Sequence, residues 1–199
     1  MNAGRHSTST KQIGAIPSIG ASLKAVPYRT PLQLVKTQGQ VHIHTSSYRG
    51  SFSVVLSEAL RSAGLGSRVL IAQFLRGGVN QGAEGAIHLC GRLEWLRPSI
   101  ECCLPDNSSA NDLSLQKKSH QKAIKEIWEI CKMRLEKNTI DKMVLDEIGL
   151  AISLGFIEEN DVVSTINSRP LSTDIILTGP SIPIPLSEMA DQITELRCS

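Results

Sequence analysis

The sequence Arg68-Val-Leu-Ile-Ala-Gln-Phe74, followed by Leu75-Arg76-Gly77-Gly78, decides the fold class. It is a continuous apolar run between turn residues, which is typical of a strand buried on both faces of a parallel sheet. Two further runs of this kind, residues 142–146 and 174–178, follow downstream with helical patterns between them. The chain therefore predicts an α/β fold with a mostly parallel sheet and helices on both faces.

The segment upstream predicts a strand, a loop and a helix in that order. Residues 41–45 alternate apolar and polar side chains, and residues 46–50 break the pattern. From Phe52 to Ala63 apolar residues recur at steps of three and four, which indicates one face of a helix, and Gly64 stands where such a helix would end. Because backbone N–H groups and the helix dipole favour anions at a helix N-terminus, this topology suits a phosphate.

The residues of this loop do not form a standard phosphate-binding motif. The loop, residues 45–53, reads Thr-Ser-Ser-Tyr-Arg-Gly-Ser-Phe-Ser. A Walker loop requires glycines for close backbone approach, a lysine for the phosphates and a hydroxyl for Mg²⁺. As an isolated motif, the loop therefore fails.

Two acidic residues, Asp146 and Glu147, end the buried strand at 142–146. Ligands of open α/β sheets gather at the carboxyl ends of the strands, so these acids are expected at the same edge as the loop. Carboxylates there could hold hydrated Mg²⁺. Alternatively, Glu147 begins the next helix, where an acid is favoured by the dipole alone.

Composition limits the classes of protein that the chain can represent. With 199 residues and 41% hydrophobic content it can close one core. A formal charge of +2 and a pI near 8.3 argue against nucleic-acid binding. The sequence contains no apolar run of about 18 residues, so we predict no membrane-spanning helix. Five cysteines without a Cys-x-x-Cys pair fit neither a disulfide framework nor a structural zinc site, so we expect a reducing, cytoplasmic location.

The first acidic residue is Glu58, and the chain before it is basic and rich in Ser, Thr, Gly and Pro. We expect residues 1–38 to be a disordered basic tail and residues 39–199 to be one P-loop-like α/β domain. An acid-poor, Ser-rich start is also typical of organelle transit peptides, so import into an organelle stays open.

A colinear set of motifs resembles a known family. The segments are 41–45, 59–66 (ALRSAGLG), 69–77 (VLIAQFLRG), 82–84, 144–148 (VLDEI), 167–170 (NSRP), 175–179 (IILTG) and 190–196 (ADQITEL). They resemble the P-loop adenosyltransferases that act on cob(I)alamin or cob(I)yrinic acid a,c-diamide. The resemblance implies transfer of the 5′-deoxyadenosyl group of ATP to the Co(I) of a reduced corrinoid in cobalamin biosynthesis, with Mg²⁺ assisting, and a homodimer.

The resemblance also implies a set of site residues, none of them acting covalently. The nucleotide side would comprise Thr45, Arg49, Gly50, Ser51 and Ser53, the corrinoid side Gln73, Arg76 and Glu84, and the magnesium side Asp146 and Glu147. The family's loop lysine falls on Ser51 and its magnesium hydroxyl on Phe52. Arg49 is the candidate replacement for the lysine, because guanidinium binds phosphate well.

Two hypotheses follow for the function. The chain is either a corrinoid adenosyltransferase with altered nucleotide recognition, or a catalytically inactive P-loop-like paralogue that acts as a binding or regulatory protein. A P-loop kinase or ATPase is disfavoured, because it would need the same missing lysine.

Overall fold

The computed structural model describes residues 38–50, 52–78, 82, 84–101, 103–104 and 114–197, without the side chains of 114–116. All of these belong to one compact unit, Lys36–Ser199. The predicted tail and Ser51 lie outside the described residues, apart from position 38. Among the described residues, no helix is both long enough and apolar enough to cross a membrane.

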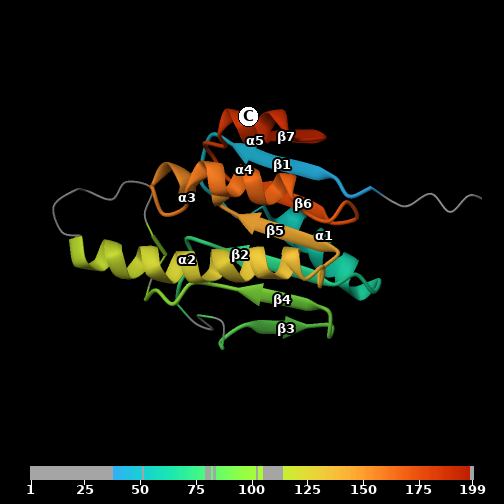
Figure 1. The fold of residues 1–199 in the computed structure, drawn as a ribbon, viewed down its shortest axis with the longest axis horizontal. Coiled ribbons are helices and arrows are strands. Elements are labelled where there is room, and N and C mark those ends of the chain that lie inside the picture. The colour runs from blue at the N-terminus through green and yellow to red at the C-terminus, as the bar shows by residue number, and fades with distance from the viewer. Residues whose placement is uncertain are drawn as a thin grey trace, which may run out of the picture. The chain divides into compact units, whose positions relative to one another are not determined.

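A seven-stranded sheet forms the centre of the domain, in the order β3-β4-β2-β5-β6-β1-β7 (Figure 1). All neighbouring strands run parallel except β3 and β4, which are antiparallel. The strands are β1 (Val41–Ser46), β2 (Val69–Gln73), β3 (Ile87–Leu89), β4 (Leu93–Leu96), β5 (Lys142–Asp146), β6 (Asp174–Thr178) and β7 (Gln192–Leu196). The predicted mostly parallel sheet is confirmed.

Helices cover both faces of this sheet. They are α1 (Ser53–Gly64), α2 (Ser114–Glu136), α3 (Ile148–Ser153), α4 (Glu159–Asn167) and α5 (Ile184–Glu188). Figure 1 shows α2 and α4 in front of the sheet and α1 behind it. The apolar stripe of α1 faces inward through Val55, Ala59 and Ala63, as the spacing predicts.

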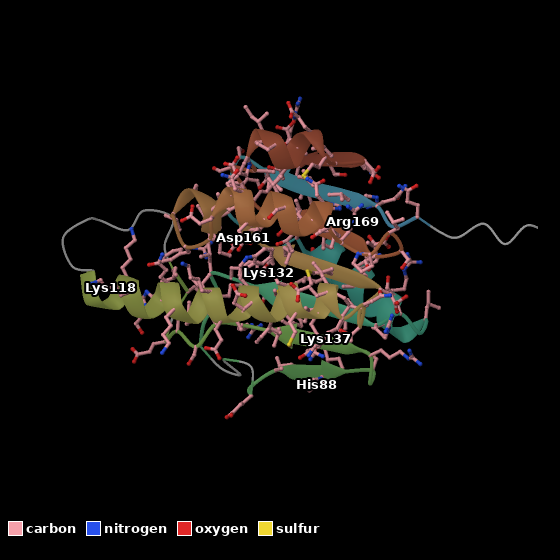
Figure 2. The ribbon with its side chains drawn as sticks, viewed as in Figure 1. His88, Lys118, Lys132, Lys137, Asp161 and Arg169 are labelled. Carbon is pink, nitrogen blue, oxygen red and sulfur yellow. The ribbon has the colours of Figure 1, made fainter. Side chains whose placement is uncertain are left out.

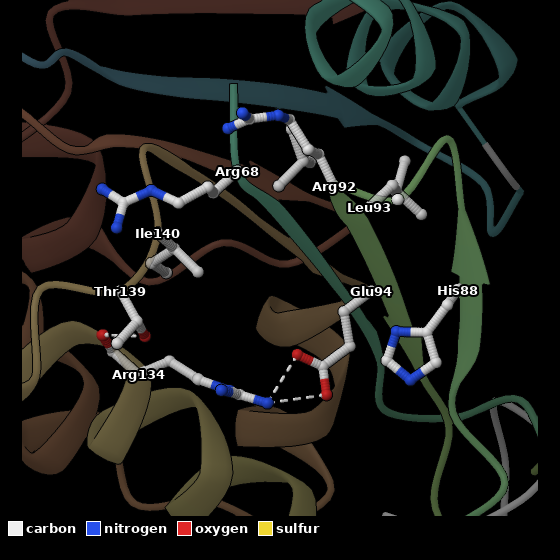
Figure 3. Close-up of a pocket in the computed structure, with 10 residues that line it drawn as sticks. Arg68, His88, Arg92, Leu93, Glu94, Arg134, Thr139 and Ile140 are labelled. Atoms are coloured by element: carbon white, nitrogen blue, oxygen red, sulfur yellow. Dashed lines mark hydrogen bonds and ion pairs between the residues drawn. The ribbon is translucent and has the colours of Figure 1, made fainter. Parts of the chain in front are cut away.

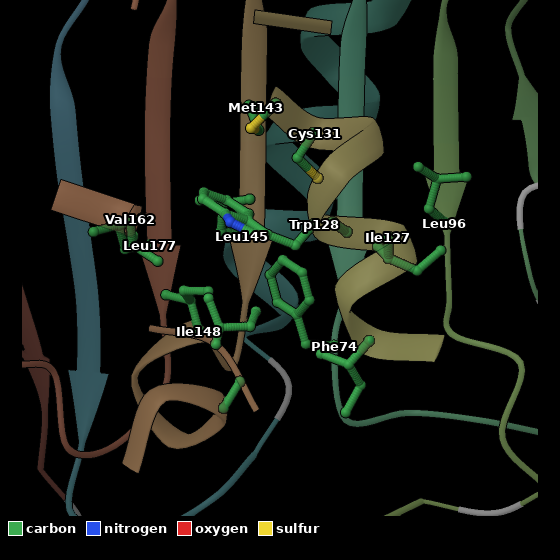
Figure 4. Packing of buried hydrophobic residues seen from close by; sticks show 14 of the residues in the cluster. Phe74, Leu96, Ile127, Trp128, Cys131, Met143, Leu145, Ile148, Val162 and Leu177 are labelled. Atoms are coloured by element: carbon green, nitrogen blue, oxygen red, sulfur yellow. The ribbon is translucent and has the colours of Figure 1, made fainter. Parts of the chain in front are cut away.

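Two apolar clusters fill the space between the sheet and these helices. The smaller cluster packs α1 against one face, through Ile71, Val144 and Ile176. The larger lies on the other face and includes Trp128 of α2, whose ring meets Phe74 edge-on at 6.3 Å between centroids (Figure 4). Trp128 is 2% exposed, which confirms that it is a core residue and not a ligand platform.

A polar contact joins α2 and α4, which cover the face of the sheet that carries the larger cluster. Trp128 Nε1 donates to Asp161 Oδ2 at 2.7 Å, and Lys132 Nζ lies 3.1 Å from the same oxygen. Figure 2 shows Lys132 and Asp161 between α2 and α4. Although burial opposes it, the hydrogen bonds from Trp128 and Lys132 lower the pKa of Asp161, so this brace is charged at neutral pH.

The predicted elements agree closely with the observed ones. The strands at 142–146 and 174–178 have the predicted bounds, and the first strand continues one residue further, to Ser46. Because β1, β2, β5 and β6 are parallel, their carboxyl ends meet along one edge, which we call the carboxyl edge; the opposite one is the amino edge. The candidate site lies at the carboxyl edge.

Candidate functional site

The centre of the site is Asp146, the last residue of β5. Its side chain is 2% exposed. Thr178 Oγ1, at the end of β6, donates to Asp146 Oδ1 at 2.5 Å, and Gln73 Nε2, at the end of β2, donates to Oδ2 at 2.7 Å. Neighbouring strands thus hold both carboxylate oxygens. We call Gln73, Asp146, Glu147 and Thr178 the rim.

Burial sets the electrostatics of this carboxyl group. Desolvation raises the pKa of Asp146 above its ordinary value, and the adjacent charge of Glu147 acts in the same direction. The hydrogen bonds from Thr178 and Gln73 and the charge of Arg76 oppose the shift without cancelling it. A buried acid of this kind is typical of functional sites in α/β proteins.

Glu147 occupies an unusual backbone position next to Asp146. It precedes α3 with φ 62° in the left-handed region, and its side chain is fully buried. Its backbone N–H donates to Thr178 Oγ1 at 3.1 Å. Gly179 packs against this turn with φ 118°, and a Cβ there would come within 3.0 Å of the Glu147 Cα. The hydrogen bond to Thr178 and the close packing of Gly179 therefore both fix this turn. Glycine is required at position 179 because of its positive φ and the short distance to Glu147.

Arg49 of the first loop binds Glu147 directly. Its Nε lies 2.7 Å from Oε1 and its Nη2 2.9 Å from Oε2, a two-pronged ion pair. The same guanidinium also donates to the carbonyls of Leu75, at 3.2 Å, and of Leu104. The structure thus brings the first loop and the rim together across 98 residues of sequence.

Arg76 is a second cation at the rim. Its Nε lies 3.9 Å from Asp146 Oδ2 and its Nη2 3.9 Å from Glu147 Oε1. These distances are too long for hydrogen bonds, so the attraction is electrostatic. The Nε of Arg76 is buried without a hydrogen-bond partner among the described residues. Arg76 is therefore less tightly bound to the acids than Arg49 is.

Gln73 supports Asp146 from the side. It is 2% exposed, and its Oε1 accepts hydrogen bonds from Trp95 Nε1 at 2.9 Å and from Arg97 Nε at 3.0 Å. The Arg97 guanidinium also lies over the Trp95 ring, 5.3 Å from its centroid. Sequence reasoning placed Gln73 and Arg76 near the site but missed Thr178, Trp95 and Arg97.

One small cavity adjoins the described part of the first loop. Ser46, Tyr48, Gly50, Phe52 and Leu196 line a cavity of about 30 Å³, which is room for about one water molecule. Phe52 is 5% exposed and packs inward, as predicted from the apolar stripe of its helix, with its ring 6.3 Å from that of His44. A cavity of this size does not hold a triphosphate.

The remaining predicted residues are less closely tied to the rim. Thr45 lies near the end of β1 and is paired with Glu195 of β7. Ser53 is exposed at the first position of α1, and a Cβ on Gly50 would meet the Tyr48 ring at 3.5 Å. Glu84 is exposed in the segment before β3 and makes no hydrogen bond or ion pair within the described part of the chain.

The donor set does not fit Mg²⁺ in this arrangement. Both oxygens of Asp146 accept hydrogen bonds from the protein, and both oxygens of Glu147 face Arg49. Magnesium requires free oxygen ligands in octahedral geometry. Across the described ranges, no three His, Cys, Asp or Glu side chains are grouped to hold a metal ion.

The class of protein follows from the fold and the site together. The loop after the first strand contacts a buried pair of acids at the carboxyl edge of a mostly parallel sheet, which is the arrangement of a P-loop-like α/β protein. A family model described as ATP:corrinoid adenosyltransferase BtuR/CobO/CobP matches residues 37–199, and the chain belongs to this family. The resemblance found in the sequence is therefore confirmed.

Individual relatives agree with this assignment. The chain is 24% identical over 160 residues to the corrinoid adenosyltransferase of Escherichia coli strain K12, covering 80% of this chain and 77% of that protein. It is 23% identical over 183 residues to the Pseudomonas aeruginosa enzyme of the same name, covering 87% and 82%. An uncharacterised Nostoc protein is 30% identical over 180 residues, covering 80% of this chain and 44% of that longer protein.

Proposed function

We propose that the chain transfers the 5′-deoxyadenosyl group of ATP to the Co(I) of a reduced corrinoid, with Arg49 acting in place of the family's loop lysine. The observation that carries the proposal is the ion pair between Arg49 and Glu147, which sets a cation of the first loop at the buried acids. In such a reaction the cobalt–C5′ bond forms as the bond from C5′ to the triphosphate oxygen breaks.

The protein's part in this reaction is to position the substrates and neutralise charge. The planar guanidinium of Arg49 matches the geometry of phosphate oxygens, so it can exchange Glu147 for the triphosphate when ATP binds. Arg76, 3.9 Å from Glu147, then remains to balance that acid. Because both carboxylates are already occupied by protein donors, we assign no step to Mg²⁺.

The decisive experiment mixes the full chain with ATP and a chemically reduced corrinoid, and measures formation of a light-sensitive adenosylated product. We expect product with the unchanged chain and a loss of about ten- to a hundredfold in Arg49→Gln, the size expected from removing one charge-assisted hydrogen bond. Arg197→Gln is the matched control, because Arg197 is 82% exposed and pairs only with Glu195 among the described residues. No product above the protein-free background would overturn the proposal.

A second candidate function is that of an inactive paralogue which binds a ligand without transferring a group. The small cavity at the first loop and the buried position of Phe52 favour it. Thermal unfolding separates the two candidates, since a ligand that binds the folded state alone raises the melting temperature. A shift with corrinoid but none with millimolar ATP would select the binding protein.

Restoring the family's loop chemistry tests whether the backbone still forms a phosphate cradle. We expect Ser51→Lys to tighten ATP binding by about tenfold in calorimetry. The double variant Ser51→Lys, Phe52→Thr restores the hydroxyl as well, but it removes a side chain that is 5% exposed, which costs about 3 kcal/mol of stability. Unchanged ATP affinity in both variants would show that no cradle forms.

The family resemblance also supports a homodimer acting in the cytoplasm. Sedimentation of the purified chain tests the first expectation, and localisation of a tagged full-length chain tests the second. A monomer at micromolar concentration would contradict the dimer.

A further inference from the structure

A sizeable cavity lies at the amino edge of the sheet, away from the rim. It has a volume of about 410 Å³ and lies where β2, β4 and β5 begin. Its polar lining comprises Arg68, His88, Arg92, Glu94, Arg134 and Thr139, and we call this cavity the amino-edge pocket. The volume is within the range of pockets that hold small molecules.

Guanidinium groups outnumber carboxylates around this pocket. Arg134 Nη2 reaches both oxygens of Glu94, at 2.9 and 2.7 Å, and Arg68 binds Asp141 just outside the lining, at 2.5 Å. Arg92 is exposed and makes no side-chain hydrogen bond or ion pair within the described segments. Three arginines and two carboxylates therefore lie at or beside the pocket, and the surplus charge is positive.

Figure 3 shows the pocket as an open centre with side chains around it. Arg68 and Thr139 lie on one side, Glu94 and His88 on the other, and Arg134 reaches across to Glu94. The Nε of Arg134 is buried and has no hydrogen-bond partner among the described residues. That atom is closed off from the pocket, whereas the side chains of Arg134 and Glu94 as a whole are 34% and 20% exposed, so a ligand would meet the outer part of this ion pair.

The backbone beneath these side chains is fixed. The carbonyl of Arg92 accepts from Val69 N–H at 2.8 Å, and the carbonyl of Arg68 accepts from Asp141 N–H at 2.8 Å. Thr139 Oγ1 donates to the Arg134 carbonyl at 3.2 Å. The arginines thus stand on anchored backbone, and only their long side chains must rearrange to meet a ligand.

We infer that the amino-edge pocket binds a small multivalent oxyanion, a ligand that carries two or more phosphate or carboxylate groups. Arginine forks bind both kinds of group in pairs of parallel hydrogen bonds. In the absence of the ligand, Glu94 takes the place of one such group at Arg134. This assignment is independent of the chemistry at the rim.

Calorimetric titration of the full chain with inorganic pyrophosphate, and separately with citrate, tests the inference and distinguishes the two sources of the charge. We expect saturable binding of at least one probe. Arg92→Gln should weaken it about tenfold, as expected for one lost charge-assisted hydrogen bond. Arg197→Gln should leave the affinity for the probe unchanged. Arg197 is exposed and follows β7, which is the edge strand at the opposite end of the sheet from β3 and β4.

Glu94→Gln gives a result that a merely structural role would not produce. Because the carboxylate competes with the ligand for Arg134, its neutralisation should tighten binding of the same probe several-fold. The inference is overturned if neither probe binds, if Glu94→Gln weakens binding, or if Arg92→Gln binds the probe as tightly as the unchanged chain does.

Discussion

Arginine side chains differ in burial and in ion pairing between the two edges of the sheet. At the carboxyl edge Arg49 is 16% exposed and fully engaged with the buried Glu147. At the amino edge Arg68 is 44% exposed, and Arg92 is exposed without an ion pair among the described residues. Buried charges persist only when they are paired and hydrogen-bonded, whereas a hydrated pocket tolerates a surplus. The comparison shows a buried arginine held by a buried carboxylate at one edge, and an exposed arginine without an ion pair among the described residues at the other.

The largest effect is expected at the ion pair of the carboxyl edge. Arg49→Gln leaves Glu147 buried without its partner, so we expect the free energy of unfolding to fall by about 3–5 kcal/mol. Chemical denaturation of the variant measures this loss.

A double variant checks that the loss comes from the unpaired charge. In Arg49→Gln with Glu147→Gln the unpaired charge at position 147 is removed, and most of the stability should return. A double variant as unstable as the sum of the two single variants would show that the ion pair is not the cause.

A smaller effect is expected at Thr178, which is fully buried. Its hydroxyl donates to Asp146 and accepts from the Glu147 backbone, so Thr178→Val should cost about 1–3 kcal/mol by leaving buried polar groups unsatisfied. Thr178→Ser keeps the hydroxyl and is the control. Equal stability of the two variants in denaturant titrations would contradict the role of the hydrogen bonds.

The smallest effect is expected at the amino edge, between Arg68 and Asp141. The hydrogen bond from Arg68 holds the pKa of Asp141 below its usual range. The ionised carboxylate therefore stabilises the fold above the unfolded pKa, and this contribution is lost as pH falls through the lowered folded pKa. Because both side chains are more than 40% exposed, we expect Asp141→Asn to cost under about 1 kcal/mol at neutral pH.

Denaturation at several pH values checks this expectation. The gap in stability between the unchanged chain and Asp141→Asn should close in acid. A gap that is constant with pH would show that the charge of Asp141 does not contribute.

The sequence predicted the central strands because they are buried on both faces and therefore strongly apolar. It did not predict β3 and β4, since β3 has three residues and β4 contains Glu94 and the half-buried Trp95, so neither shows a clear run or alternation. The edge strand β7 is mostly exposed and was recognised only through the family motif at its position.

The candidate site was predicted in outline and missed in detail. The meeting of the first loop with Asp146 and Glu147 follows from parallel topology alone. The engagement of Arg49 with Glu147 could not be read from the sequence, because a side chain can turn toward a ligand or toward an acid. Thr178 could have been found, since it ends the strand next to the one that Asp146 ends.

The hydrogen bond from Trp95 to Gln73, and from Gln73 onward to Asp146, gives the chain a built-in optical reporter. The sequence contains two tryptophans, and the second, Trp128, is enclosed in the core. With Trp128→Phe as background, the emission of Trp95 would register events at the acid pair without an added dye. Fluorescence could then follow occupancy of this edge in real time, separately from unfolding.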